Sequence, residues 1–295
     1  MCPILSDRYR AKDRLLRNFL MTWRLLPVQF PGKMRLARCL FWPFSDIQDV
    51  QVADKWGCEF VVPNLRSPIG FCLVTDGVYE PLTMQFLLRH LRDGSVFIDV
   101  GAAIGVFTIP MAKLVGERGC VLAIEPSPTV FPYLRRNAEL NHLRNVRLKN
   151  CAAYDRNVDD VSFYEAPLDH FGMGSLAAQF HGQPVSVHAQ TLDSILAEER
   201  IHHVDMIKVD VEGCEDIVFR GAKRLLTTTD APIILFEFCD WAEARVPGAR
   251  PGNAQAVLRE YGYKIWRLPD FLGKRRGPSK EAITKGFEML VAVKR

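Results

Sequence analysis

The sequence predicts a doubly wound α/β fold that ends in an antiparallel pair of strands. From Ser95 onward, short apolar runs that suit buried strands alternate with segments of helical periodicity. The last two strand-like runs, 263–268 and 287–293, are joined by a basic loop at 273–277, and we expect no helix between them. These patterns together predict a parallel sheet, covered by helices, with a final strand inserted antiparallel.

The stretch from Ser95 to Glu125 is the most informative part of the chain. It predicts a buried strand at 96–100, a turn containing Gly101, Ala103 and Gly105, a helix, and a strand at 120–124. Such a turn aims helix N–H groups at a ligand, and its glycines admit a close approach. Glu125, at the tip of the second strand, can accept hydrogen bonds from ribose hydroxyls. We interpret the stretch as a nucleoside-binding unit. The alternative is that its glycines serve packing alone.

The glycine spacing indicates which kind of nucleoside to expect. Asp99-x-Gly101-x-x-x-Gly105 lacks the third glycine of the dinucleotide pattern G-x-G-x-x-G. This favours a nucleoside without phosphates, of which S-adenosylmethionine is the commonest. A nicotinamide dehydrogenase is disfavoured by the same gap and by the antiparallel ending. That ending is typical of the class I methyltransferase form of the Rossmann-like fold.

The chain divides into three predicted parts. Residues 1–45 form a basic extension with an amphipathic helix at 9–26 and a short helix at 33–41. Residues 46–78 form a small antiparallel β segment that leads into the core. Residues 79–295 form the main domain, in which an insertion at about 156–190 contains a hairpin and could cover the site.

Turn signals and apolar periodicity place the remaining elements. In the β segment the expected strands are 49–52, 58–62 and 71–74. In the main domain the further expected strands are 146–152, 204–210 and 232–238. The further expected helices are 81–91, 217–226, 254–261 and one that starts at 126–128 and runs to 140.

Composition predicts a cytoplasmic protein with reduced thiols. The 295 residues are 48% hydrophobic and 24% charged, and no apolar run reaches the ~18 residues of a membrane span. The N-terminus lacks the features of a signal peptide. The eight cysteines are scattered without a C-x-x-C pair, so we expect neither disulfides nor a structural zinc site.

Basic charge is concentrated at the N-terminus. Residues 1–40 contain nine Lys or Arg and two Asp, a net charge of +7, which leaves −3 for the rest of the chain. Because the core is not basic, we expect no nucleic-acid partner. A basic amphipathic helix can contact a membrane surface peripherally, or pack on its own domain, which we favour. The sequence does not indicate an oligomeric state.

A second group of polar residues follows the predicted strand at 204–210. Lys208 and Asp210 share one face of this strand, and Asp210, Glu212 and Glu237 lie near strand tips. Clustered carboxylates can act as a general base or bind a divalent cation. We assign these three to catalysis and assign no metal site. Glu215 and Asp216 fit better as acids in the first turn of a helix.

Several segments together resemble the FkbM-type methyltransferases. They are GVYEP, FIDVGAAIGVFT, AIEPSP, TLDSIL and DMIKVDVEGCEDIVFRGAKRLL, and they cover roughly residues 70 to 240. The resemblance implies S-adenosylmethionine-dependent O-methyl transfer, often to hydroxyls of sugars or natural products. The implied cofactor-binding residues are Glu80, Asp99, Gly101, Ala103, Gly105, Glu125, Pro126 and Ala152.

Within that set the expected roles differ. Asp99, Gly101 and Gly105 would line the methionine part of the cofactor, Glu125 the ribose, and Ala152 the adenine. The family usually has Asn where Ala103 stands, so we expect one polar contact fewer near the cofactor.

Two hypotheses of function follow. The first is an O-methyltransferase for a small-molecule or glycan acceptor, in which Asp210 positions or deprotonates the acceptor hydroxyl, with Glu212 and Glu237 as weaker candidates. His170, His181 and His188 of the insertion are further candidate bases, although each fits a surface or packing role better. The second hypothesis is an inactive binding module, held at a membrane by the basic N-terminal helix.

Overall fold

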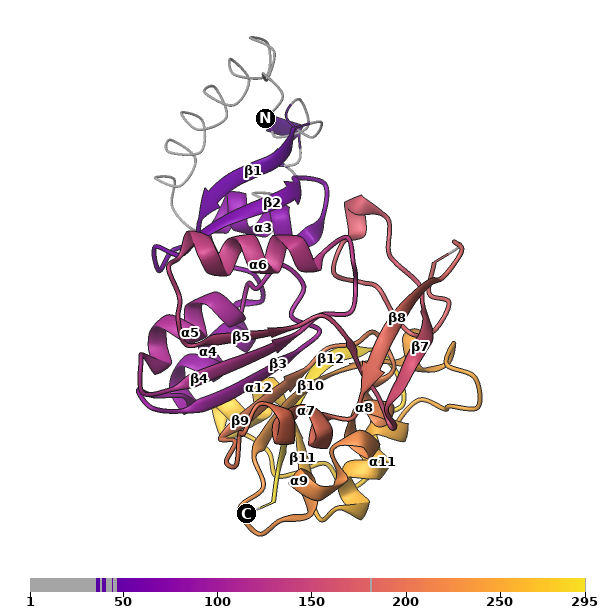
Figure 1. The fold of residues 1–295 in the computed structure, drawn as a ribbon. Coiled ribbons are helices and arrows are strands. Elements are labelled where there is room, and N and C mark those ends of the chain that lie inside the picture. The colour runs from indigo at the N-terminus through magenta and orange to yellow at the C-terminus, as the bar shows by residue number, and fades with distance from the viewer. Residues whose placement is uncertain (1–35, 38, 41–43, 45–46, 181, 295) are drawn as a thin grey trace. The chain divides into compact units, whose positions relative to one another are not determined.

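The computed structural model describes residues 36–37, 39–40, 44, 47–180 and 182–294 (Figure 1). The chain forms two compact units. The smaller contains the residues up to Tyr79 together with Pro167–Phe171, and the larger contains Glu80–Ala166 and Gly172–Arg295. The helix predicted at 9–26 lies outside the described residues. In the region predicted as a short helix, Leu36, Ala37, Cys39 and Leu40 are helical.

The smaller unit contains one hairpin and one helix. Strands β1 (Gln48–Ala53) and β2 (Glu59–Asn64) pair antiparallel, as predicted. The third strand, predicted at 71–74, is wrong, because these residues belong to helix α3 (Pro68–Asp76). The Ser67 side chain accepts a hydrogen bond from the N–H of Gly70 at 3.0 Å, and Pro68 occupies the first turn. Ser followed by Pro is a helix-start signal, and it outweighs the β-branched residues that follow.

A seven-stranded sheet runs through the larger unit in the order β11-β12-β10-β9-β3-β4-β5 (Figure 1). Its strand β12 is antiparallel to both neighbours, and the other adjacent pairs are parallel. This order confirms the predicted fold class. The strands are β3 (Val96–Val100), β4 (Cys120–Ile124), β5 (Val146–Lys149), β9 (Met206–Val209), β10 (Ile233–Cys239), β11 (Lys264–Arg267) and β12 (Phe287–Val293).

Helices cover this sheet in two groups. Helix α4 (Pro81–His90) contacts α5 (Thr108–Val115) and α12 (Leu268–Gly273), whereas α8 (Glu215–Gly221) contacts α7 (Leu192–Glu198), α9 (Lys223–Thr227) and α11 (Asn253–Glu260). The second group buries Ile195, Phe219 and Leu258 against the sheet residues Leu122 and Val209. The remaining helices of this unit are α6 (Phe131–Leu140) and α10 (Asp240–Glu243). No helix in the described part of the chain is long and apolar enough to cross a membrane.

Two predictions for the larger unit need correction. Helix α12 lies in the connection where no helix was expected, with Pro269 at its start and Asp270 in its first turn, both favourable positions for these residues. The strand predicted at 146–152 is two strands in different sheets, because the chain leaves β5 at Asn150. The Asn150 side chain donates to the carbonyl oxygens of Glu125 and Pro126, which holds this break in place.

The insertion forms its own three-stranded sheet, β6-β8-β7. Strands β7 (Val158–Phe163) and β8 (Val185–Gln190) make the predicted antiparallel hairpin, and β6 (Ala152–Ala153) pairs parallel with β8. The short helix η2 (Leu168–His170) belongs to the smaller unit. No disulfide joins the seven cysteines of the described residues.

Candidate active site

Four strand ends bring the candidate residues together. Asp99 lies in β3 and Glu237 in β10, whereas Glu125 and Asp210 directly follow β4 and β9. These strands are parallel and in register, with Asp99 opposite Lys208 and Phe236 opposite Val209. Their carboxyl ends therefore meet at one edge of the sheet, where open α/β folds bind ligands.

The turn after β3 is shaped by backbone packing. Gly101 has a φ of 77°, and a Cβ on it would lie 1.8 Å from the carbonyl oxygen of Asp210. Gly105 has a φ of 91°, and its Cβ would lie 2.9 Å from Leu134 Cδ1 on α6. The fold itself therefore requires glycine at both positions. This packing requirement explains the spacing of Gly101 and Gly105 even without a bound ligand. The close approach of Gly101 to Asp210 also places the turn after β3 against the turn after β9.

Glu125 is a buried carboxylate oriented by two backbone amides. Only 6% of the residue is exposed. The N–H of Ala103 donates to Oε2 and the N–H of Ser127 donates to Oε1, both at 2.9 Å. Burial raises its pKa to about 7 despite these hydrogen bonds. An ionised carboxylate accepts up to about four hydrogen bonds, so acceptor capacity remains for a vicinal diol such as ribose.

Ala103 contributes through its backbone. Its φ of 47° is unusual for a residue with a Cβ, and it aims the N–H at Glu125. A residue of any type can make this contact, provided that it adopts this backbone angle. The lack of an Asn side chain at position 103 therefore leaves the hydrogen bond to Glu125 intact.

Lys208 forms a buried ion cluster with two aspartates. Its Nζ lies 2.9 Å from Asp210 Oδ2 and 3.9 Å from Asp99 Oδ1, with the ring of Phe107 at 4.9 Å. Burial opposes its charge, but the Asp210, Asp99 and Glu80 carboxylates raise the pKa of Lys208 above its ordinary value. The sequence predicted that Lys208 and Asp210 share a face, which the structure confirms. It gave no signal for the buried partnership with Asp99.

Asp99 is enclosed by protein. The residue is fully buried, its Oδ2 accepts a 2.6 Å hydrogen bond from Thr108 Oγ1, and burial raises its pKa. These contacts explain why a strand residue with no exposed surface is an aspartate. A role for Asp99 in lining the methionine part of a cofactor stays a prediction.

Asp210, Glu212 and Glu237 form the carboxylate cluster predicted from the sequence. One oxygen from each lies within 4.8 Å of the others. Burial, reinforced by the neighbouring Asp210 and Glu215 charges, raises the pKa of Glu212 to about 8. Burial likewise raises the pKa of Glu237 well above its ordinary value, with Asp210 and Glu212 adding to the effect. Raised carboxyl pKa values near neutrality are typical of functional sites.

The loop that carries Glu212 is fixed from two sides. Glu215 Oε1 accepts hydrogen bonds from the N–H groups of Val211 and Gly213, and Glu215 begins α8, as expected for an acid in a first turn. From the insertion, Ser175 Oγ and Gln179 Nε2 each donate to the Glu212 carbonyl at 2.9 Å. The insertion thus reaches the carboxylate cluster, a contact between distant segments that sequence reasoning did not identify.

The other predicted residues are placed differently. Glu80 caps α4 and accepts a hydrogen bond from Thr83 Oγ1, and its charge raises the pKa values of Glu212 and Glu237. Pro126 follows Glu125, and its carbonyl accepts from Asn150. Ala152 packs in the core of the insertion with Phe163, Val187 and Ala189. An adenine contact for Ala152 stays a prediction.

The two described candidate histidines each lie beside an aspartate that does not belong to the carboxylate cluster. His170 is half-exposed, lies beside Asp169, and belongs to the smaller unit. His188 is exposed on β8 and lies 3.8 Å from Asp159. His181 lies outside the described residues. The surface role favoured by the sequence is therefore the better one for the two described histidines.

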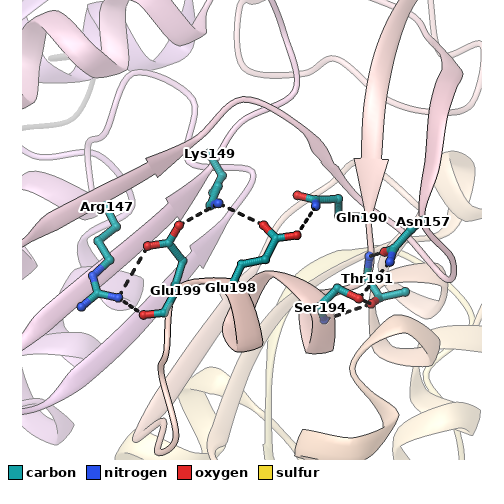
Figure 2. Close-up of polar contacts among 8 residues, drawn as sticks. All are labelled: Arg147, Lys149, Asn157, Gln190, Thr191, Ser194, Glu198 and Glu199. Carbon is teal, nitrogen blue, oxygen red and sulfur yellow. Dashed lines mark hydrogen bonds and ion pairs between the residues drawn. The ribbon is translucent and has the colours of Figure 1, made fainter.

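The TLDSIL segment has a structural explanation, seen in Figure 2. Thr191 caps α7 by accepting the N–H of Ser194 at 3.1 Å, and Asn157 accepts the N–H of Thr191 at 2.8 Å. The Asp193 carboxylate accepts the backbone N–H groups of Arg224 and Leu225 at the start of α9. The TLDSIL segment therefore stabilises the N-terminal ends of α7 and α9, two of the helices that cover the sheet.

The strand order and the antiparallel β12 are those of the class I methyltransferase fold. The methyltransferase FkbM domain matches residues 99–265, more than half of the chain. The chain therefore belongs to the FkbM methyltransferase family, and its cofactor is S-adenosylmethionine. The sequence-based expectation of an enzyme of this family is confirmed.

Three curated relatives are similar over much of the chain. The 31-O-demethyl-FK506 methyltransferase FkbM of Streptomyces tacrolimicus is 28% identical over 70% of this chain and 90% of its own length. Methyltransferase 1 of Beauveria bassiana is 28% identical over 60% of this chain and 78% of its own length. The hexuronic acid methyltransferase AglP of Haloferax volcanii is 23% identical over 52% of this chain and 61% of its own length.

Proposed function

We propose that the protein transfers a methyl group from S-adenosylmethionine to a hydroxyl of a small-molecule acceptor, either a sugar or a natural product. The observation that carries this proposal is the cluster of Asp210, Glu212 and Glu237, whose oxygens lie within 4.8 Å of one another beside the glycine turn. The names of two relatives add support, since one acts on demethyl-FK506 at an oxygen and another on hexuronic acid.

The cofactor side of the proposed site is the turn after β3 and the tip of β4. Glu125 would accept the ribose hydroxyls, because its buried carboxylate is already oriented by two backbone amides and keeps acceptor capacity. Glu80, Gly101, Ala103, Gly105 and Pro126 would border the bound cofactor. When bound, S-adenosylmethionine supplies an electrophilic methyl group on a positively charged sulfur.

The acceptor side is the tip of β9 and β10. Asp210 would position the acceptor hydroxyl and receive its proton, held in place by its ion pair with Lys208. Glu212 and Glu237 would hold a second polar group of the acceptor. Methyl transfer to an oxygen requires an aligned hydroxyl and a proton acceptor, and this chain offers carboxylates for both tasks.

Transfer of radiolabel from the cofactor's methyl group tests this proposal. The purified chain would be incubated with methyl-labelled cofactor and matched acceptors: a hexuronic acid, a macrolide alcohol, and the same molecules with each hydroxyl already methylated. We expect label in the free alcohols and none in the blocked analogues. Label that enters only amines or carboxylates, with hydroxyls untouched, would refute O-methylation while leaving the family assignment in place.

A further inference from the structure

The carboxylate cluster holds more negative charge than its described neighbours neutralise. Lys208 is the cation that contacts it, through Asp210 Oδ2, and this lysine is shared with Asp99. Among the described residues, no hydrogen bond or ion pair reaches the carboxylates of Glu212 and Glu237. Glu237 is only 4% exposed, and its Oε2 is a buried oxygen without a hydrogen-bond partner in this part of the chain. A buried unpaired carboxylate is costly unless a ligand or a proton satisfies it.

The geometry of the cluster suits a small cation. Around an octahedral ion with metal–oxygen distances of about 2.1 Å, ligand oxygens lie about 3 to 4.2 Å apart, and around a larger ion somewhat farther. One oxygen from each of Asp210, Glu212 and Glu237 lies within 4.8 Å of the others. Lys208 donates to Oδ2 of Asp210, and among the described residues the Asp210 side chain makes no other hydrogen bond or ion pair. One oxygen per side chain is thus available to a shared ligand.

We propose that Asp210, Glu212 and Glu237 bind one divalent cation of the Mg²⁺ type. The three donors are all carboxylate oxygens, the ligands that Mg²⁺, Mn²⁺ and Ca²⁺ prefer, and the group contains no thiolate or imidazole for a softer metal. The raised pKa values of Glu212 and Glu237 agree with this arrangement, since a cation would replace the protons that burial otherwise favours. This departs from the sequence-based assignment of no metal site.

The role of the cation rests on the proposed function, although its binding does not. Mg²⁺ usually keeps several coordination positions for water or substrate oxygens. A hydroxyl bound there would be oriented toward the cofactor and would pass its proton to the Asp210 carboxylate more readily, because the cation would stabilise the alkoxide charge. Asp210, Glu212 and Glu237 would then recognise acceptors with two neighbouring oxygens, such as a diol or a hydroxy acid.

Binding of Mn²⁺ to the full chain, freed of metal by a chelator and gel filtration, tests the proposal directly. The electron paramagnetic resonance signal of free Mn²⁺ falls as the ion binds, and Mg²⁺ should compete. We expect one site in the unaltered chain and at least tenfold weaker binding in Glu237→Gln and Glu212→Gln. Glu243→Gln is the matched control: Glu243 is equally buried and has an unpartnered Oε1, but it lies outside the cluster, so binding should be unchanged.

Two results would overturn the cation site. One is no Mn²⁺ binding at millimolar concentration by an unaltered chain whose circular dichroism and thermal melt show that it is folded. The other is equal binding by Glu237→Gln and the unaltered chain. Calorimetry with S-adenosylmethionine separates this failure from failure of the proposed function, because cofactor binding through Glu125 does not need the cluster. A chain that binds cofactor but not Mn²⁺ keeps the proposed function and loses only the cation.

Discussion

Lys208 and Asp210 form an ion pair over 2.9 Å at the tip of β9, and the lysine side chain is only 2% exposed. A buried cation of this kind holds its partner carboxylate in one position. Asp210 is the least buried member of the carboxylate cluster, and it is the one closest to the glycine turn, since Gly101 packs against its carbonyl. This relationship makes Asp210 the first residue to test.

Replacing Asp210 by Asn should lower turnover by ~10²–10⁴ with little change in cofactor affinity. Asn keeps the shape and a hydrogen bond to Lys208 but can neither accept a proton nor bind a cation tightly. Steady-state kinetics and calorimetry would measure the two quantities separately. Partial rescue by excess Mg²⁺ would identify the lost function as cation binding, whereas no rescue would identify a general base. Near-normal turnover would remove Asp210 from the chemical step.

Replacing Glu125 by Ala should weaken S-adenosylmethionine binding at least tenfold. The change removes charge-assisted hydrogen bonds to ribose, each worth ~1.5–3 kcal/mol. It also leaves the Ala103 and Ser127 amides without their acceptor. Calorimetry would measure the affinity, with Glu165→Gln as a control, because Glu165 also contacts Ser127 but through its hydroxyl. Unchanged affinity in a folded Glu125→Ala chain would mean that ribose binds elsewhere.

Stability should fall as pH rises from about 5 to about 8. Burial raises the pKa of Glu125 to about 7 and those of Glu212 and Glu215 to about 8, so the folded chain holds these protons more tightly than the unfolded chain. The free energy of unfolding therefore decreases across this range, by up to ~1.4 kcal/mol per pH unit for each group.

Urea unfolding in chelator at pH 5.5 and 8 would measure this dependence. Glu125→Gln should give a shallower slope between pH 5 and 7, because it removes one titrating group. A free energy of unfolding that rises with pH over this range would contradict the raised pKa values.

Thr191→Val should cost ~1 kcal/mol of stability, because it removes the hydroxyl that caps α7 by accepting the Ser194 N–H. Glu198→Gln at the other end of the same helix should cost less, since Glu198 takes part in an exposed ion pair with Lys149 (Figure 2). Chemical denaturation would measure both. A loss for Thr191→Val no larger than that for Glu198→Gln would contradict the capping role of Thr191.

A chain that begins near Asp46 should remain folded and bind cofactor, because the predicted N-terminal helix lies outside the family match at 99–265. Circular dichroism and calorimetry would test this. Insoluble or molten material would mean instead that the Leu16, Phe19 and Trp23 face of that helix completes the core of the domain.

Local patterns along the chain were sufficient for the fold class and for most of the strands. Alternating strand and helix periodicities predicted the parallel sheet and its antiparallel ending, because right-handed crossovers leave few topologies for such a pattern. They failed at 71–74, where the capping Ser67 and Pro68 outweighed a run of strand-like residues, and at α12. In both cases the helix begins with a proline in its first turn, Pro68 in α3 and Pro269 in α12.

The sequence predicted the individual residues of the candidate site but not the contacts between them. Glu125, Asp210 and Glu237 could be named because each ends a predicted strand, and parallel strands end at one edge of a sheet. Neither the buried Lys208–Asp99 contact nor the hydrogen bonds from Ser175 and Gln179 to Glu212 could be predicted. Those contacts join residues far apart in sequence through side-chain packing.

The sequence by itself determined the fold class, the family and the strand ends where chemistry-bearing residues gather, because these follow from periodicity and local motifs. Only the tertiary structure decided which of those residues are enclosed by protein and which face one another. Asp99 became an internal partner of Lys208, and Asp210, Glu212 and Glu237 became a close cluster with an unpartnered oxygen. The physical reason is that charge and burial act through space, so the state of a carboxylate depends on neighbours that only folding supplies.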